Sequence, residues 1–240
     1  MNSADQAGTG AVNDQDAAAA TGPMDVWWVR LLRTWGTILV ILLTAAGFAF
    51  ASPYFLAFSN ANNILFSMIV SALVSMGLTY VVVVGSFDLS VGLTVTTTSI
   101  MVAFLIPVVG PWLAIVLALV GASLIGLVNG LLVTYGRLSG IVVTLGMMFV
   151  LGGINVFLTG GYQVPVDYNE LAFLYLGQGK IGAVAFPVLI LFVVFLFAHL
   201  LATKTRVGHY ITAVGDNPMA AYYSGINVYR WVIASFILAA

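Results

Sequence analysis

The sequence predicts an all-α bundle of membrane-spanning helices, and three observations support this fold class. Hydrophobic residues make up 62% of the chain and charged residues only 6%, whereas a soluble domain of this size carries about a quarter charged residues. The apolar residues form separate blocks, each close to the ~20 residues that cross the hydrocarbon core of a bilayer. The basic residues fall almost entirely on one side when these blocks are threaded alternately through the membrane.

The N-terminal segment differs in composition from the rest of the chain. Residues 1–25 are polar, small and acidic, and they lack the basic segment and short apolar core of a signal peptide. We therefore predict a disordered cytoplasmic tail over residues 1–25 and a transmembrane domain over residues 26–240. Arg30 and Arg33 directly precede the first apolar block, which favours an N-terminus on the cytoplasmic side.

The apolar blocks predict about six full spans and the start of a seventh, which are helices because backbone groups inside a membrane must satisfy their own hydrogen bonds. Polar residues 59–63 (SNANN) and the Gly110-Pro111 pair are expected to form turns. Longer loops are expected over residues 159–182 and 203–230. The predicted spans are residues 35–58, 64–84, 88–107, 112–135, 141–158 and 183–202, with a seventh from Trp231.

Alternation of these spans separates the basic residues by side. With the N-terminus inside, Lys180 is the only basic residue outside, which is a strong orientation signal. The sequence thus predicts a multi-pass protein of the bacterial inner membrane, in contact with lipids. The basic residues on the predicted cytoplasmic side are Arg30, Arg33, Arg137, Lys204, Arg206 and Arg230.

Several functional classes are excluded by what the chain lacks. It has no Cys and only two His, which do not stand at a recognisable metal-ligand spacing. No GxxxxGK[ST] phosphate-binding loop occurs, and no Lys/Arg cluster is dense enough for nucleic acid. We expect no catalytic residues, no metal and no cofactor.

One carboxylate, Asp88, falls at the join of the second and third spans, within VVVVGSFDLSVG (residues 81–92). A carboxylate near a membrane is costly and indicates a structural or functional role. Asp88 or Ser90 can cap the third helix, with Gly85 and Gly92 allowing a tight turn and close packing. Direct contact with a substrate is the alternative.

Uncharged polar residues inside the spans suit a path for a neutral, hydroxylated solute, but they suit hydrogen bonds between helices equally well. The lack of a series of intramembrane ionisable residues argues against an ion or proton pump. Gly126 and Gly130 form a GxxxG pair that favours close helix packing. The residues on the possible path are Thr94, Asn129, Thr144 and Asn155.

The loop over residues 203–230 contains signals for a short helix outside the membrane. Asp216 or Asn217 can cap it, Pro218 fits its first position, and Gly225 can end it. This helix presents small and aromatic residues, which suits docking to a cytoplasmic partner. Its docking surface includes Met219, Ala220, Ala221, Tyr222 and Tyr223.

These segments carry a resemblance to a known family. MAAYYSG (residues 219–225) resembles the EAA-x-x-x-G coupling motif of ABC-importer permeases, and GSFDLSVG (residues 85–92) resembles the GGIDLSVG signature of ribose-type monosaccharide permeases. The similarity continues through NGLLVTYGRLSGIVVTLGMMFVLGGI, FLTGG, LGQG and KTRVGHYITAVGDNPMAAYYSGINV, in the family's order and spacing. Together these segments cover most of the chain from about residue 60 to residue 240.

The resemblance implies a permease subunit of an ATP-driven monosaccharide importer. It implies ABC ATPase subunits that dock on the 217–225 helix, a periplasmic or extracellular sugar-binding protein and a second permease copy. Met219 stands where the family usually has Glu, which removes a charge that can pair with the ATPase. Family members continue with further spans, so we expect this chain to match the N-terminal two-thirds to three-quarters of one.

An ATP-independent carrier half or a membrane scaffold subunit is the alternative function. A carrier is expected to contain intramembrane ionisable residues or broken helices around an ion site, and only the region around Asp88 suggests either. A membrane enzyme needs a nucleophile, a metal or paired carboxylates, and the sequence shows none of these.

Overall fold

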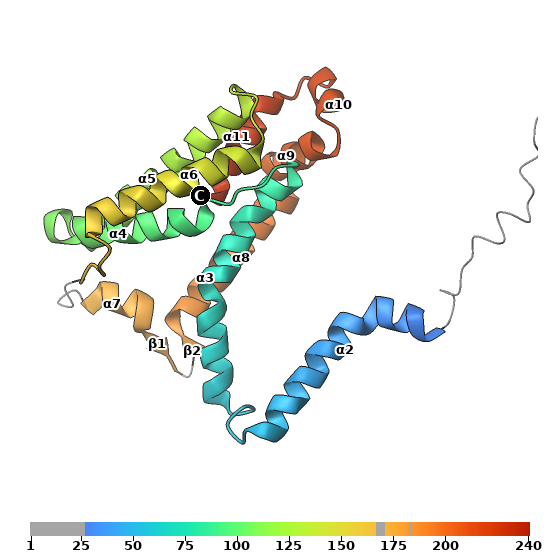
Figure 1. Cartoon of the computed structure of the whole chain (residues 1–240), viewed down its shortest axis with the longest axis vertical. Coiled ribbons are helices and arrows are strands. Elements are labelled where there is room, and N and C mark those ends of the chain that lie inside the picture. The colour runs from blue at the N-terminus through green and yellow to red at the C-terminus, as the bar shows by residue number, and fades with distance from the viewer. Residues whose placement is uncertain (1–26, 167–170, 183) are drawn as a thin grey trace, which may run out of the picture. The chain divides into compact units, whose positions relative to one another are not determined.

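The structure, a computed structural model, describes residues 27–166, 171–182 and 184–240. The described residues form helices and one short two-stranded hairpin (Figure 1), which confirms the predicted all-α class. The chain divides into two compact units, Met1–Ala61 and Asn62–Ala240. The predicted tail over residues 1–25 lies outside the described residues.

The first unit contains helix α2 (Trp27–Ala51), whose apolar part Trp35–Ala51 is shorter than the later spans. The helix ends just before Ser52-Pro53 and not at residue 58 as predicted, because the residue before a proline disfavours helical geometry. A compact turn follows, in which the rings of Phe48 and Phe55 stack with centroids 5.6 Å apart.

The predicted turn over residues 59–63 is wrong, because helix α3 (Phe58–Val83) already begins at Phe58. Pro53 interrupts the chain earlier than the polar residues do, and the turn therefore falls before Phe58. Within this unit the Asn60 side chain donates a hydrogen bond to the Phe55 carbonyl (2.8 Å), which stabilises the new helix start.

Five helices of the described residues are long and apolar enough to cross a membrane, which makes this a multi-pass membrane protein. The Gly110-Pro111 break is confirmed, since Gly110 has a φ of +77° and separates two of these helices. The five are α3, α4 (Val91–Val109), α5 (Pro111–Thr134), α6 (Gly140–Thr159) and α8 (Phe186–Lys204); α11 (Val228–Ala239) is shorter.

Small residues on α5 explain the packing of the helices around it. Every fourth residue of α5 from Ala114 to Thr134 is small and buried, and such spacing forms one stripe along a helix. A side chain at Gly126 would collide with the Phe236 carbonyl of α11, and a Cβ at Gly130 would lie 2.8 Å from Ile233 Cα. The predicted GxxxG packing is thus confirmed, and α4, α5, α6 and α11 run side by side (Figure 1).

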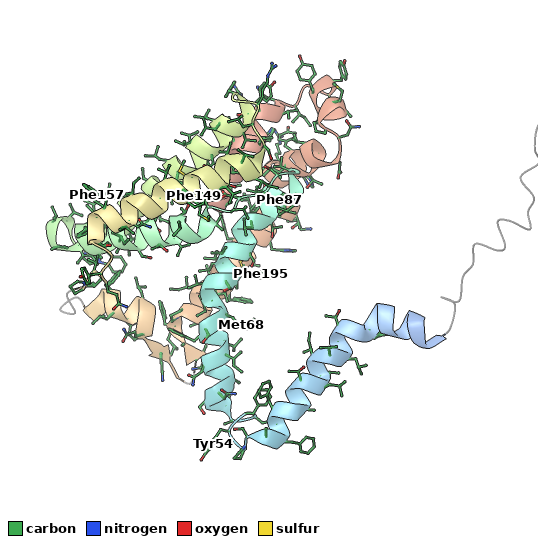
Figure 2. All side chains as sticks on the ribbon, in the orientation of Figure 1. Tyr54, Met68, Phe87, Phe149, Phe157 and Phe195 are labelled. Carbon is green, nitrogen blue, oxygen red and sulfur yellow. The ribbon has the colours of Figure 1, made fainter. Side chains whose placement is uncertain are left out.

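Polar and apolar side chains are distributed as in a membrane protein. Large apolar side chains are exposed on the helices, among them Phe149 and Phe157 of α6 and Phe195 of α8 (Figure 2). No residue of α8 is buried. Exposed apolar surface of this extent fits contact with lipid, whereas nine polar or charged side chains are buried among the residues whose burial the structure describes.

Both predicted long loops contain helices. The 159–182 loop includes α7 (Leu171–Gln178) and strand β1 (Lys180–Ile181), which pairs antiparallel with β2 (Val184–Ala185). The 203–230 loop includes α9 (Arg206–Asp216) as well as the expected short helix α10 (Pro218–Tyr223). The residues of α9 did not suggest a helix because their apolar positions Val207, Ile211 and Val214 are few, although they share one face.

Candidate functional site

Helix α3 ends in a glycine turn, here called the signature turn (residues 85–90). Gly85 has a φ of +85°, a conformation that glycine adopts without steric cost. Its N–H donates to the Val82 carbonyl (3.0 Å), and the Ser86 N–H donates to the Val81 carbonyl (2.9 Å). These two bonds form a Schellman motif, so Gly85 has the turn-forming role predicted for it.

Asp88 lies in this turn and is buried, with only 4% of its surface exposed. Its Oδ1 accepts hydrogen bonds from the Ser90 N–H (2.8 Å) and from the Ser90 hydroxyl (2.6 Å). Both donors precede α4, which begins at Val91 and has no side-chain cap. Ser90 is the N-cap residue of α4, although its side chain makes no cap bond. Asp88 accepts the backbone N–H of Ser90 at the start of the helix, as predicted for one of these two residues.

The signature turn is tied to α5 and α6 by buried side chains. The Asn129 amide of α5 donates to the Ser90 hydroxyl (2.9 Å), and the Leu89 N–H donates to the Thr144 hydroxyl of α6 (3.1 Å). Asn129 and Thr144 are fully buried. We call Asp88, Ser90, Asn129 and Thr144 the polar cluster; its members come from three separate elements.

Two oxygens of the polar cluster, Asp88 Oδ2 and Asn129 Oδ1, have no hydrogen-bond partner within the described residues. Unpartnered buried acceptors are uncommon in folded proteins and each indicates a role beyond packing. Asn155 of α6 is also buried and its amide has no partner among the described residues.

Two other predicted residues lie outside these bonds. Thr94 is buried but donates only to the Ser90 carbonyl of its own helix (3.1 Å). Gly92 is exposed and a Cβ there would meet nothing within 4 Å. The predicted close packing at Gly92 is therefore wrong, because that face of α4 is open. Close approach occurs instead at Gly140 of α6, where a side chain would collide with the Ser86 hydroxyl.

Helix α10 has the limits expected from its sequence. The Asn217 side chain accepts a hydrogen bond from the Ala220 N–H (3.0 Å) and Pro218 is the first helical residue. Gly225, with a φ of +81°, ends the helix in a second Schellman motif through the Gly225 and Ile226 N–H groups. The cap is thus Asn217 and not Asp216, which is the last residue of α9.

One face of α10 is exposed and the other is buried. Met219 and Tyr222 are each 64% exposed and Tyr223 is 80% exposed. Together with the segment up to Tyr229 they line an open pocket of about 910 Å³. Ala221 faces inward and packs with Tyr80, Val84, Ile211 and Val214. The exposed residues carry no charge, so the surface is apolar and aromatic.

A family model described as the branched-chain amino acid transport system / permease component matches residues 60–240. The chain belongs to this family. It is 34% identical over 84% of its length to the ribose import permease protein RbsC of Escherichia coli, and covers 64% of that protein.

Two further relatives carry the names of other sugars. The L-arabinose permease protein AraH of Azospirillum brasilense is 31% identical over 94% of this chain, which covers 66% of that protein. The D-allose permease protein AlsC of Escherichia coli is 30% identical over 85% of this chain, which covers 63% of that protein. The chain thus spans less than two thirds of the length of these curated relatives. No solved structure matches it.

Folding of this chain brings together some of the predicted site residues and separates others. Asp88, Ser90, Asn129 and Thr144 converge. Thr94 bonds only to the backbone carbonyl of Ser90, and the Asn155 side chain has no partner among the described residues. The residues predicted to couple to an ATPase lie together on α10 and its two ends. The close contacts at Gly140 and Gly215 were not predicted from the sequence. Each glycine lies where an apolar stretch meets polar residues, which is only a weak signal of close backbone approach.

Proposed function

We propose that the chain is the membrane-spanning permease subunit of an ATP-driven importer for a monosaccharide such as ribose. Its similarity to permeases named for ribose, L-arabinose and D-allose carries this proposal. The buried polar cluster and the exposed helix α10 are consistent with it. The protein lies in the bacterial inner membrane with its N-terminus in the cytoplasm, as its one-sided basic residues favour.

In this proposal the partners supply energy and substrate. ABC ATPase subunits dock on α10, because the helix presents an exposed apolar surface on the predicted cytoplasmic side. A sugar-binding protein delivers the substrate from the opposite side, and a second permease copy completes the complex. The permease itself needs no ATPase site, metal or cofactor. Met219 replaces a family Glu, so its contribution to docking is apolar.

The mechanism follows from these positions. ATP binding closes the ATPase subunits, α10 transmits that movement, and the bundle changes the exposure of its central path from outside to inside. The nucleotide state can drive this change only if it binds one bundle conformation more tightly than the other. Asn155, Thr94, Asn129 and Thr144 are the candidates for polar groups along the path, with Gly85, Asp88, Ser90 and Gly92 near it.

Branched-chain amino acids are a second candidate substrate class, because the family model is described by them. An amino acid carries a charged ammonium and a charged carboxylate, whereas a monosaccharide offers uncharged hydroxyl groups and a ring oxygen. The polar groups proposed for the path are hydroxyls and amides apart from Asp88, which fits the neutral solute. Uptake of radiolabelled ribose, L-arabinose, D-allose and leucine by cells expressing the permease distinguishes the two classes.

An ATP-independent carrier half or a scaffold subunit is the contrasting function. A carrier moves its coupling ion through buried ionisable groups. Asp88 is the only carboxylate among the buried residues that the structure describes, and none of those residues is Lys, Arg or His, which favours the ATP-driven importer.

Replacement of Gly225 by Trp tests the docking assignment. At a φ of +81° any other residue is strained, and the indole would also project beside the docking surface. We expect Gly225→Trp to lower sugar uptake and recovery of the ATPase subunit on co-purification by roughly tenfold. Gly161→Trp is the matched control, since Gly161 also has a φ of +81° and open space but lies in the predicted outer loop. Normal uptake and ATPase association in Gly225→Trp would count against the assignment.

A further inference from the structure

Helix α10 rests on the end of α3 through a shared apolar core. Ala221 of α10 packs with Tyr80 and Val84 of the α3 end, together with Ile211 and Val214 of α9. Val84 and Val214 are 8% and 0% exposed, so a displacement of α10 must either move the α3 end or open this core. Close-packed interiors resist opening and transmit such displacements.

Backbone contact between α9 and α3 reinforces this core. A Cβ at Gly215 would collide with the Val83 carbonyl oxygen and lie 3.3 Å from Val84 Cα. The two backbones are therefore as close as they can be without a side chain between them. Since α9 also leads directly into α10, both elements move with the last turn of α3.

The signature turn continues this contact toward the bundle. It begins one residue after Val84, and the Schellman motif at Gly85 fixes its direction. At its far end Ser90 accepts from Asn129 of α5, and the Leu89 N–H donates to Thr144 of α6. Gly140 adds a steric contact, because a Cβ there would lie 3.0 Å from the Phe87 carbonyl oxygen.

We propose that the signature turn couples α10 to α5 and α6, with Ser90, Asn129 and Thr144 as the positioning residues that keep the turn attached to both helices. This inference rests on the proposed importer function and adds to it the residues that carry the movement. The turn directly follows Val84 of the core beneath α10 and is hydrogen-bonded to α5 and α6. Helix α11 also packs on that core and against α5, but α11 makes no hydrogen bond to the polar cluster among the described residues.

The two unpartnered oxygens of the polar cluster are consistent with a signature turn that can adopt two positions. In this arrangement Asp88 Oδ2 and Asn129 Oδ1 lack a donor among the described residues, although both residues are more than nine-tenths buried. A second position of the turn that brings a donor to either oxygen recovers the lost hydrogen bond. Such an element can respond to a small displacement of α10 by switching, as allosteric elements do.

A matched set of threonine variants tests the link in the full natural product of the gene, reconstituted with its ATPase subunit and binding protein. Thr144→Val keeps the shape of the side chain but removes the acceptor for the Leu89 N–H, whereas Thr144→Ser keeps the hydroxyl. Thr97→Val is the control, because Thr97 is also buried on a neighbouring helix but bonds only to its own Leu93 carbonyl. The measurement is the number of sugar molecules imported per ATP hydrolysed, with ribose as the probe.

We expect Thr144→Val to assemble and hydrolyse ATP, with the import-to-hydrolysis ratio lowered about fivefold or more at every ribose concentration. Thr144→Ser and Thr97→Val are expected to retain the ratio. A ratio restored by saturating ribose would show a lost substrate contact and overturn the proposal. The proposal would also be overturned if Thr144→Val and Thr144→Ser gave the same import-to-hydrolysis ratio, whether both lowered the ratio or both retained it. Wild-type protein that does not associate with an ATPase would instead refute the importer function.

Discussion

Asp88 directs one carboxylate oxygen to two donors of the same residue, the N–H and the hydroxyl of Ser90. The motif spacing indicated that this carboxylate belongs to a turn, and Gly85 behaves as predicted. The partners of this turn on other helices could not be predicted. Asn129 is 39 residues from Ser90, and Thr144 is 55 residues from Leu89. Nothing in the local sequence specifies which faces of α5 and α6 will meet the turn.

Removal of the Asp88 carboxylate is expected to destabilise the fold. Asp88→Ala leaves the buried Ser90 N–H and hydroxyl without their acceptor, and an unsatisfied buried donor costs about 1–3 kcal/mol. Asp88→Asn retains an oxygen at the Oδ1 position and should lose much less. The unfolding midpoint of the detergent-solubilised protein, followed by tryptophan fluorescence, checks this. Equal midpoints for Asp88→Ala and wild type would show that the two bonds to Ser90 contribute nothing.

Helix existence was easier to predict than helix ends. Long apolar blocks predicted α4, α5, α6 and α8 to within about three residues at each end, because the length and hydropathy of a span depend on the bilayer and not on its neighbours. For α3 the end was predicted correctly but the start was placed too late. The 59–63 turn was wrong because Pro53 ends α2 first. Helix α9 was missed because its apolar face becomes evident only beside the end of α3, where Gly215 lets the two backbones meet.

A glycine-to-alanine pair tests the close packing of α5 against α11. Gly126→Ala places a methyl group against the Phe236 carbonyl and within 2.9 Å of Ile237 Cα, and overpacking of this kind costs about 1–3 kcal/mol. Gly146→Ala adds the same group on α6 where nothing lies within 4 Å. We expect a lower unfolding midpoint for Gly126→Ala and an unchanged or slightly higher one for Gly146→Ala. A midpoint equal to wild type in Gly126→Ala would mean that α11 does not pack there.

At the scale of the whole molecule, the distribution of charge and polarity supports one account. The predicted threading places six of the seven basic residues on the same side as α10. The described helices expose apolar side chains, and the buried polar cluster joins the signature turn to α5 and α6. The bundle class could be predicted from composition alone. Substrate and partners could not, because they depend on polar groups and surfaces that only the folded chain assembles, and on proteins outside it.

ATP-dependent transport is the most direct test of the proposed importer. Proteoliposomes would contain the full natural product of the gene with its co-purified ATPase subunit, and radiolabelled ribose, L-arabinose and D-allose would be presented with the sugar-binding protein. Uptake of at least one of these sugars is predicted only when ATP is available to the ATPase, and a non-hydrolysable analogue should abolish it. Equal uptake with and without ATP hydrolysis would contradict the account.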